Sequence, residues 1–255
     1  MGGEFEAFSD YEGWNGYGAW PGRTTQMAEA GHALVYLNIN THDTDRGRKV
    51  PVCWRSIAAG QQDAAVVAWA SAIVRGGYQG HMVITVEHEP NVVSRQQPKC
   101  PGDRPADYRA MFDHVYRLMR DHGVTAPFAF IPTISLYRTH QADEYLPPAS
   151  DIQVYGADVY NRVPLGRAGY HGAGTDLTTM LAWGDARLPG RPVLVGEIGD
   201  TRRDPAQGDW VTGAATVASE HGDFLAMNWN LTPGYLPVEG PGRDEWLAWA
   251  RRWRT

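Results

Sequence analysis

The chain has 255 residues, with 23 Lys and Arg against 29 Asp and Glu, which gives a formal net charge of −6. This acidic balance argues against nucleic acid or an anionic membrane as the main partner, and no apolar run approaches the roughly 18 residues of a membrane helix. With 43% hydrophobic and 20% charged residues the chain is too apolar to be disordered, and its length suits one large domain.

Short apolar runs alternate with amphipathic segments along the chain, a pattern typical of a parallel sheet whose strands are connected by helices. Eight strands are predicted, at residues 4–8, 33–39, 53–58, 81–87, 127–132, 152–160, 192–198 and 224–230. Helices are predicted near residues 24–30 and at 63–74, 107–122, 176–183, 209–221 and 244–254. No repeat or linker divides the sequence, so we expect an α/β fold, a single (β/α)8 TIM barrel over residues 1–255.

Aromatic residues and cysteines add two observations. The chain has 10 Trp and 12 Tyr against only 6 Phe. Rings with an apolar face and a polar edge suit sugar-binding clefts, although we expect at least half of them to pack in the core. Trp246, Trp249 and Trp253 in the last predicted helix have the spacing of a packing seam. Cys53 and Cys100 are the only cysteines, and their spacing does not decide whether they pair.

Polar residues end several of the predicted strands. In a parallel barrel the active site forms at the C-terminal ends of the strands. The fourth predicted strand runs into EHEPN at residues 87–91, and the seventh carries Glu197. A charge at the end of an apolar strand is costly unless it is paired or lies at the barrel mouth. Glycoside hydrolysis needs two carboxyl groups, one to protonate the leaving oxygen and one to attack, about 5–5.5 Å apart when configuration is retained.

The run HEPN at residues 88–91, together with Glu197 in PVLVGEIG, resembles the clan A glycoside hydrolases, most closely family 26, the β-mannanase family. That family carries a His-Glu-x-Asn motif at strand four, and residues 54–77 also resemble its segment before that strand. Departures are Thr85, where the family usually has Arg, and the loop at residues 92–101. The resemblance implies these roles: Glu89 as acid/base, Glu197 as nucleophile, His88 as a residue that orients the acid/base or binds a hydroxyl, Tyr160 as hydrogen-bond partner of the nucleophile, Trp229 as aromatic floor under the sugar, and Asn91 as loop support.

Further candidates come from their positions in the predicted strands. Asp158 shares a strand face with Tyr160 and could bind sugar or an arginine. Asn38, with Asn40 and His42, ends the second strand as a candidate for contacts with sugar hydroxyls. Glu87, two residues before Glu89, is interpreted as a salt-bridge residue.

Together these observations predict a retaining endo-β-glycanase that hydrolyses a β-linked polysaccharide, of the β-1,4-mannan type, by double displacement with two Glu. We expect a monomer that needs no cofactor and no metal, binds a polysaccharide or oligosaccharide, and does not bind nucleic acid or membranes. Lys occurs only at positions 49 and 99 while Arg is abundant, a bias typical of GC-rich bacterial genomes, and we expect a secreted bacterial enzyme.

Three alternatives stay open. The first is another clan A β-glycanase that acts on β-glucan or xylan. The second is a metal-dependent barrel hydrolase with His88, Glu89, Asp158 and Glu197 as ligands, although the sequence has no H-x-H or H-x-x-x-H pair. The third is a sugar-binding barrel without catalysis. The sequence does not specify the glycan, its linkage or the endo or exo mode of cleavage.

Overall fold

The computed structural model describes residues 7–22, 25–26, 33–45, 48–92, 99–134, 139–161, 172–200, 207–221 and 224–229. The strands are β1 (Ala7–Glu12), β2 (Leu34–Ile39), β3 (His42–Asp45), β4 (Arg48–Pro51), β5 (Met82–Val86), β6 (Ala129–Phe130), β7 (Val154–Asn161), β8 (Val193–Asp200) and β9 (Phe224–Trp229). The helices are α2 (Trp54–Ala58), α3 (Asp63–Gly76), α4 (Pro105–Asp121), α5 (Thr139–Tyr145), α6 (Ala173–Arg187) and α7 (Gln207–His221). Short 3-10 helices span Gly16–Gly18, Gln79–His81 and Ala149–Asp151.

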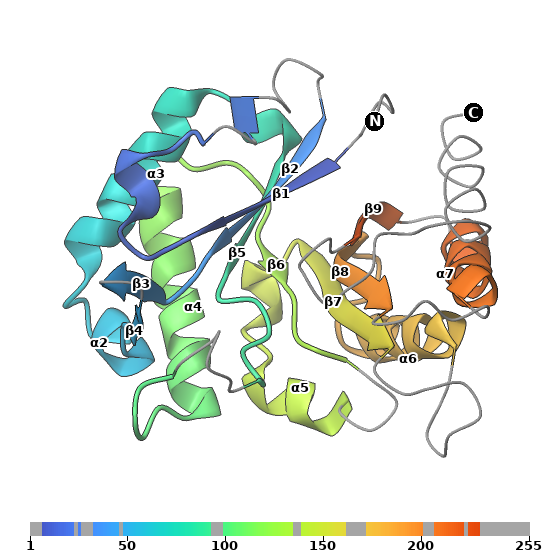
Figure 1. Ribbon diagram of the computed structural model, residues 1–255. Helices are drawn as coiled ribbons and strands as arrows, with labels where there is room; N and C mark the ends of the chain where they lie inside the picture. Colours follow the sequence, from blue (N-terminus) through green and yellow to red (C-terminus); the bar gives the residue numbers. More distant parts are fainter. Residues whose placement is uncertain are drawn as a thin grey trace.

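Seven strands of the described residues run parallel in one curved row. They form two sheets, β1-β2-β5 and β6-β7-β8-β9, joined by a single bridge between Ile84 and Phe128. Residues of β1 and β9, at the two ends of the row, approach each other. Helices α3, α4, α6 and α7 lie on the outer side of the row (Figure 1). This is the α/β arrangement expected from the sequence, and a closed ring of eight strands stays a prediction.

The core has two parts because alternate residues of each strand point to opposite faces. A small inner cluster is enclosed by the curved row, and it consists of Tyr36, Val83, Ala129, Ile131, Val154 and Leu194. A larger outer cluster fills the space between the strands and the helices. Trp54, Trp69 and Trp183 belong to this outer cluster, which confirms that part of the abundant Trp serves packing.

The helix-forming signals in the sequence are realised at α3 and α4. Apolar residues of α3 recur with helical spacing, and the helix ends at Gly77 in the left-handed conformation (φ 75°), where glycine is favoured. Pro105 occupies the first turn of α4, and Arg104 N–H donates to the Asp107 carboxylate at 2.8 Å, which closes the N-terminus. Among the described residues, no helix combines the length and apolar character that crossing a bilayer requires.

Two strand predictions were wrong. Residues 53–58 form helix α2 rather than a strand, since the buried Trp54 and Ile57 are spaced three apart, a helical and not an alternating period. The predicted first strand, 4–8, ended too early, because the polar run SDYE continues the strand Ala7–Glu12 and pairs with β2, while residues 4–6 lie outside the described residues. The predicted helix at 244–254 lies outside the described residues, as does most of the one near 24–30.

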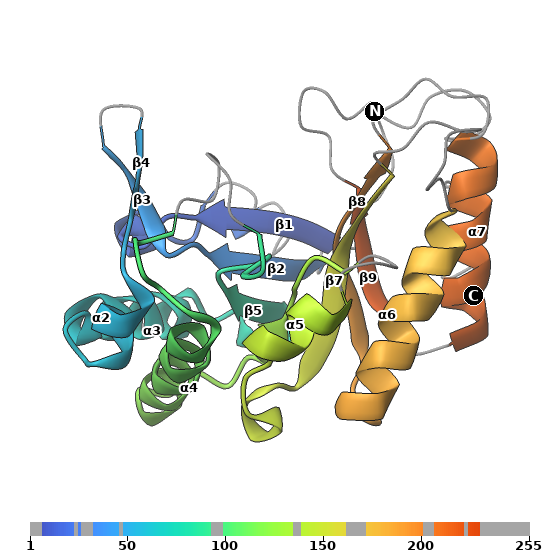
Figure 2. The ribbon, with the colours of Figure 1, turned by 90° about the horizontal axis from the view of Figure 1, so that it is seen from below.

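A hairpin and a disulfide complete the fold between β2 and α3. Strands β3 and β4 pair antiparallel and project from the body beside α2 (Figure 2). Cys53, at the start of α2, is bonded to Cys100, with the two Cα atoms 5.2 Å apart. The pairing that the sequence left open is therefore formed, and it ties α2 to the residues that precede α4.

Candidate active site

Side chains from six parallel strands meet at the C-terminal edge of the row. Glu89 follows β5, the third parallel strand of the described residues, and Glu197 lies in β8, the sixth. The sequence predicted strands four and seven; among the described residues the count is lower by one because residues 53–58, the predicted third strand, form helix α2. The separation of three strands is unchanged, and that separation brings the two carboxylates to opposite sides of one site. The other contributors are Tyr11 of β1, Asn38 of β2, Thr133 after β6, and Asp158 and Tyr160 of β7.

The residues Glu87 and Glu89 form an unusual turn after β5. Both have left-handed backbone conformations, with φ of 56° and 50°. Such conformations cost about 1–2 kcal/mol per residue for side chains other than glycine, and they persist where the surroundings enforce them. Glu89 N–H donates to the Ile131 carbonyl at 2.7 Å, and the Glu89 carboxylate accepts a hydrogen bond from the Thr133 hydroxyl at 2.5 Å. Glu89 is thereby buried, with only 8% of its surface exposed.

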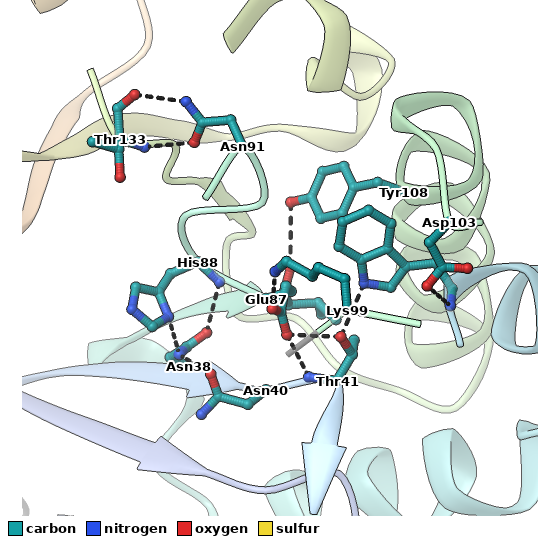
Figure 3. Close-up of polar contacts among 12 residues, drawn as sticks. Asn38, Asn40, Thr41, Glu87, His88, Asn91, Lys99, Asp103, Tyr108 and Thr133 are labelled. Atoms are coloured by element: carbon teal, nitrogen blue, oxygen red, sulfur yellow. Dashed lines mark hydrogen bonds and ion pairs between the residues drawn. The ribbon is translucent and has the colours of Figure 1, made fainter. Parts of the chain in front are cut away.

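His88 is oriented by Asn38, as Figure 3 shows. The Asn38 amide oxygen accepts the His88 backbone N–H at 3.1 Å, which assigns the Asn38 amide nitrogen to the contact with His88 Nδ1 at 2.5 Å. Since that amide nitrogen is a donor, Nδ1 is the acceptor and the ring proton of neutral His88 sits on Nε2. His88 Nε2 lies 3.8 Å from Asp158 Oδ2 and 3.7 Å from Glu197 Oε1.

Asp158 is a completely buried carboxyl group in the middle of the site. Burial and the charges of Glu197 and Glu89 raise the pKa of Asp158 well above its ordinary value. The residue reaches Glu197 through an irregularity in β8: Ala157 pairs with Val195 and Asp158 pairs with Glu197, so Gly196 is the extra residue. A Cβ atom on Gly196 would lie 2.6 Å from Asp158 Oδ1, so any larger residue here would have to displace the Asp158 carboxyl group.

Glu197 is contacted by two tyrosines. The Tyr160 hydroxyl donates a hydrogen bond to Glu197 Oε2. Tyr11 lies next to His88, with ring centroids 5.2 Å apart. The residue as a whole is 39% exposed, but its hydroxyl end faces the site. Desolvation of that hydroxyl, then the charge of Glu197 and a hydrogen bond with it, raise the pKa of Tyr11. These contacts fix the carboxylate that faces the site from β8.

Glu87 belongs to the protein interior and not to the site. Its side chain is paired with Lys99 and accepts hydrogen bonds from Thr41, so the interpretation as a salt-bridge residue is confirmed. Asn91 also has the supporting position expected of it. Its side chain bridges both backbone groups of Thr133, at 2.8 Å and 2.9 Å.

The predicted substrate-binding residues divide into three groups. His88, Asp158, Tyr160 and Asn38 lie together around the two catalytic candidates. Asn40 accepts a hydrogen bond from the Asn38 amide at 2.9 Å and His42 is buried on β3, so both lie behind the site. Trp229 is the last residue of β9, and its side chain lies outside the described residues.

Sequence reasoning missed Tyr11 and Thr133. Tyr11 was missed because the first strand was placed too early in the chain. A strand ending at Glu12 would have put Tyr11 at the same edge as the other candidates. Thr133 was detectable, since it is the first residue after the predicted strand 127–132, and that position is typical of active-site residues in barrels.

The residues His88, Glu89 and Asp158 could in principle hold a metal ion, because their ligand atoms lie within 4.8 Å of one another. The hydrogen bonds of His88 do not fit this role. A histidine that binds a metal through Nε2 carries its proton on Nδ1 and donates it to an acceptor. Here Nδ1 faces the Asn38 amide donor, so Nε2 carries the proton toward the carboxyl groups. This donor set favours proton chemistry over metal binding.

No protein-family model and no curated protein matches the chain. Solved structures are similar to it. A GH26 β-mannanase from Bacteroides ovatus has a TM-score of 0.65 and 16% identity, over 96% of this chain and 79% of that one. The catalytic domain of a GH26 endo-β-1,4-mannanase from Bacillus sp. JAMB-750 has a TM-score of 0.61 and 16% identity, over 91% of this chain and 68% of that one.

An endo-β-1,4-glucanase from Xanthomonas axonopodis pv. citri, carrying a triple mutation, is similar as well. Its TM-score is 0.63 at 13% identity, over 97% of this chain and 86% of that one. At these identities the likeness is one of fold. It confirms, at that level, the resemblance to clan A glycoside hydrolases and to family 26 inferred from the sequence.

Proposed function

We propose that the chain is a retaining endo-β-glycanase that cleaves a β-linked polysaccharide, with β-1,4-mannan as the substrate class. The observation that carries this proposal is the meeting of Glu89 and Glu197, from strands three apart, around one histidine and one buried carboxyl group. His88 directly precedes Glu89 and lies 3.7 Å from Glu197 Oε1. Two carboxyl groups that flank the scissile bond, about 5–5.5 Å apart, are the requirement for hydrolysis with retention.

In the first half of the proposed reaction Glu197 attacks the anomeric carbon while Glu89 protonates the departing glycosidic oxygen. The bond between sugar and leaving group breaks, and a covalent glycosyl-enzyme forms. The Tyr160 hydroxyl holds the carboxylate through Glu197 Oε2, and the Nε2–H of His88 faces Oε1 from 3.7 Å. In the second half Glu89 takes a proton from water, whose oxygen attacks the anomeric carbon and releases Glu197.

The remaining features of the proposal follow from the same site. Asp158, Asn38 and His88 would contact sugar hydroxyls, and Trp229 would supply a stacking surface. The reaction uses only these side chains, so we expect no cofactor. The disulfide between Cys53 and Cys100 supports an oxidising compartment, in keeping with a secreted enzyme.

The test is the release of reducing ends from mannan, glucomannan, mixed-linkage glucan, β-1,4-xylan and β-1,3-xylan. Wild type should hydrolyse at least one of these polymers, with mannan as the expected substrate. Glu197→Gln should lower kcat by about 10⁴-fold or more, since an amide does not attack the anomeric carbon and the covalent glycosyl-enzyme cannot form. Glu89→Gln should lower kcat strongly on the polymer and less on an aryl glycoside whose leaving group needs no protonation.

Glu220→Gln, an identical substitution on the exposed surface of α7, is the matched control and should keep wild-type kcat. Activity that survives Glu197→Gln would remove Glu197 as nucleophile. Binding of a glycan without turnover by wild type would instead identify a sugar-binding barrel. If the wild type is active, the polymer that it hydrolyses shows whether the substrate class is mannan, glucan or xylan.

A further inference from the structure

The turn that carries Glu89 is held from the side facing away from the site. Glu87 and Glu89, both in left-handed conformations, flank His88. The Glu87 side chain turns to Thr41 and Lys99, while His88 turns to Asn38 (Figure 3). Because the left-handed conformation is unfavourable for both Glu residues, the turn depends on the contacts that fix Glu87.

Glu87 is held by three donors in a place that water does not reach. Only 1% of its surface is exposed. Its Oε2 accepts hydrogen bonds from Thr41 N at 2.6 Å and Thr41 Oγ1 at 2.7 Å, and its Oε1 is paired with the Lys99 ammonium. Burial alone would raise the pKa of Glu87. The charge and hydrogen bond of Lys99, together with the hydrogen bonds from Thr41, instead lower this pKa below its ordinary value. The carboxylate is therefore charged and depends on its cation.

Lys99 is held in turn by the disulfide of the next residue, Cys100, and by the ring of Trp54. The next residue, Cys100, is bonded to Cys53, and the residue after Cys53 is Trp54. The Lys99 ammonium lies 4.9 Å from the centre of the Trp54 ring, and Trp54 Nε1 donates to Thr41 Oγ1 at 2.9 Å. The contacts thus close a ring that runs from Glu87 through Lys99, Cys100, Cys53, Trp54 and Thr41 back to Glu87.

We propose that Lys99 is a positioning residue for the catalytic acid: by neutralising Glu87 it holds the left-handed turn that aims Glu89, and the Cys53–Cys100 disulfide keeps Lys99 in place. This inference rests on the proposed function of Glu89. Without the ammonium, an unpaired charge is left in a buried position, and such a charge is relieved by protonation or by movement of the turn. Movement of the turn would displace Glu89 from Thr133 and from the Ile131 carbonyl.

The other titratable groups that face Glu87 among the described residues are His42 of β3, Lys49 of β4 and Tyr108 of α4. Lys49 is exposed on the hairpin and is the only other lysine of the chain. Lys49→Met is therefore a matched control, since it removes the other lysine whose charge acts on Glu87, and it does so at an exposed position on the hairpin.

The experiment measures kcat and KM against pH for wild type, Lys99→Met, Glu87→Gln and the double variant Glu87→Gln/Lys99→Met, on the glycan that wild type hydrolyses. Lys99→Met should lower kcat about 100-fold at neutral pH with KM changed little, the effect expected of a misplaced catalytic group. The double variant should recover to within about threefold of wild type, because a neutral amide needs no cation and still accepts from Thr41. Lys49→Met should keep wild-type kcat.

The pH dependence separates positioning from a general loss of stability. In Lys99→Met no cation offsets the burial of Glu87, so its pKa rises. Glu87 is then neutral at acidic pH and charged above the raised pKa. The kcat of Lys99→Met relative to wild type should therefore fall as pH rises, and the double variant should show no such fall. Wild-type kcat in Lys99→Met at every pH, or a double variant as impaired as Lys99→Met, would overturn the proposal.

A second measurement needs no turnover. Hydrogen exchange at the Glu87 and Glu89 amides, which donate to the Ile39 and Ile131 carbonyls, should quicken in Lys99→Met. It should also quicken in wild type after dithiothreitol has transferred two electrons and two protons to the disulfide, giving two thiols and oxidised dithiothreitol. If Lys99→Met does not fold, the reduced wild type carries the comparison. Unchanged exchange would refute the positioning role, whereas changed exchange in a protein without glycan turnover would refute only the glycanase function.

Discussion

At the scale of single residues, the carboxylate of Glu197 is held in a fixed position by its neighbours. It accepts from Tyr160 on one oxygen, lies near His88 on the other, and is hydrogen-bonded with Tyr11. Fixed donors around a reacting carboxylate reduce the reorganisation that accompanies bond formation. The tyrosine of β7 was predicted from the sequence, and the tyrosine of β1 was not.

Removal of the Tyr160 hydroxyl should test this arrangement. Tyr160→Phe should lower kcat by about 10²-fold, in the range measured for loss of one such donor, with a smaller change in KM. Tyr11→Phe should also lower kcat, and the double variant should be less impaired than the product of the two effects because both hydroxyls act on the same carboxylate. Steady-state kinetics of the three variants check this. Independent, multiplicative effects would contradict a shared target.

At the scale of elements, the prediction succeeded where a signal was long and failed where it was short. Helices α3 and α4 have long apolar stripes and clear end signals, and both were predicted within a few residues. Residues 53–58 offered only two apolar positions to decide between helix and strand, and the disulfide that fixes this segment depends on geometry that spacing does not reveal. The candidate site could be predicted because its residues follow strands with strong apolar signals.

The disulfide should contribute measurably to stability. It joins residues 47 positions apart, and a loop of that length corresponds to about 4 kcal/mol of stabilisation through restriction of the unfolded chain. Replacement of both cysteines by serine should lower the free energy of unfolding by up to this amount, as measured by urea denaturation at neutral pH. The same loss should follow reduction of the wild type, and a variant as stable as the wild type would contradict the estimate.

At the scale of the whole molecule, the candidate site lowers the stability of the folded protein. Three carboxyl groups, Glu89, Asp158 and Glu197, are gathered where little water reaches, and like charges brought together at such positions reduce stability. The order of strands that gathers them was predictable from the alternation of apolar runs. The bulge at Gly196 was not, because it depends on how two neighbouring strands pair.

Asp158 should therefore link stability to pH. Its pKa in the folded protein is raised well above 3.8, so the stability gained from its protonation is complete below about pH 3.8 and is lost as pH rises through the folded pKa. Asn cannot titrate, so Asp158→Asn should gain stability relative to wild type as pH is raised from about 4 to 8. Urea unfolding of both proteins across this range checks the sign. A difference between them that does not change with pH would contradict it.

Residues in the ring should vary together among related sequences. The ring links Glu87, Lys99, the disulfide, Trp54 and Thr41. Each member leaves a buried partner unsatisfied when it is lost alone, so single replacements should be eliminated and paired ones retained. Among relatives of this chain, an acid at position 87 should therefore occur together with a base at position 99, and neutral residues should replace the two together. The cysteines at positions 53 and 100 should be gained and lost as a pair with that lysine.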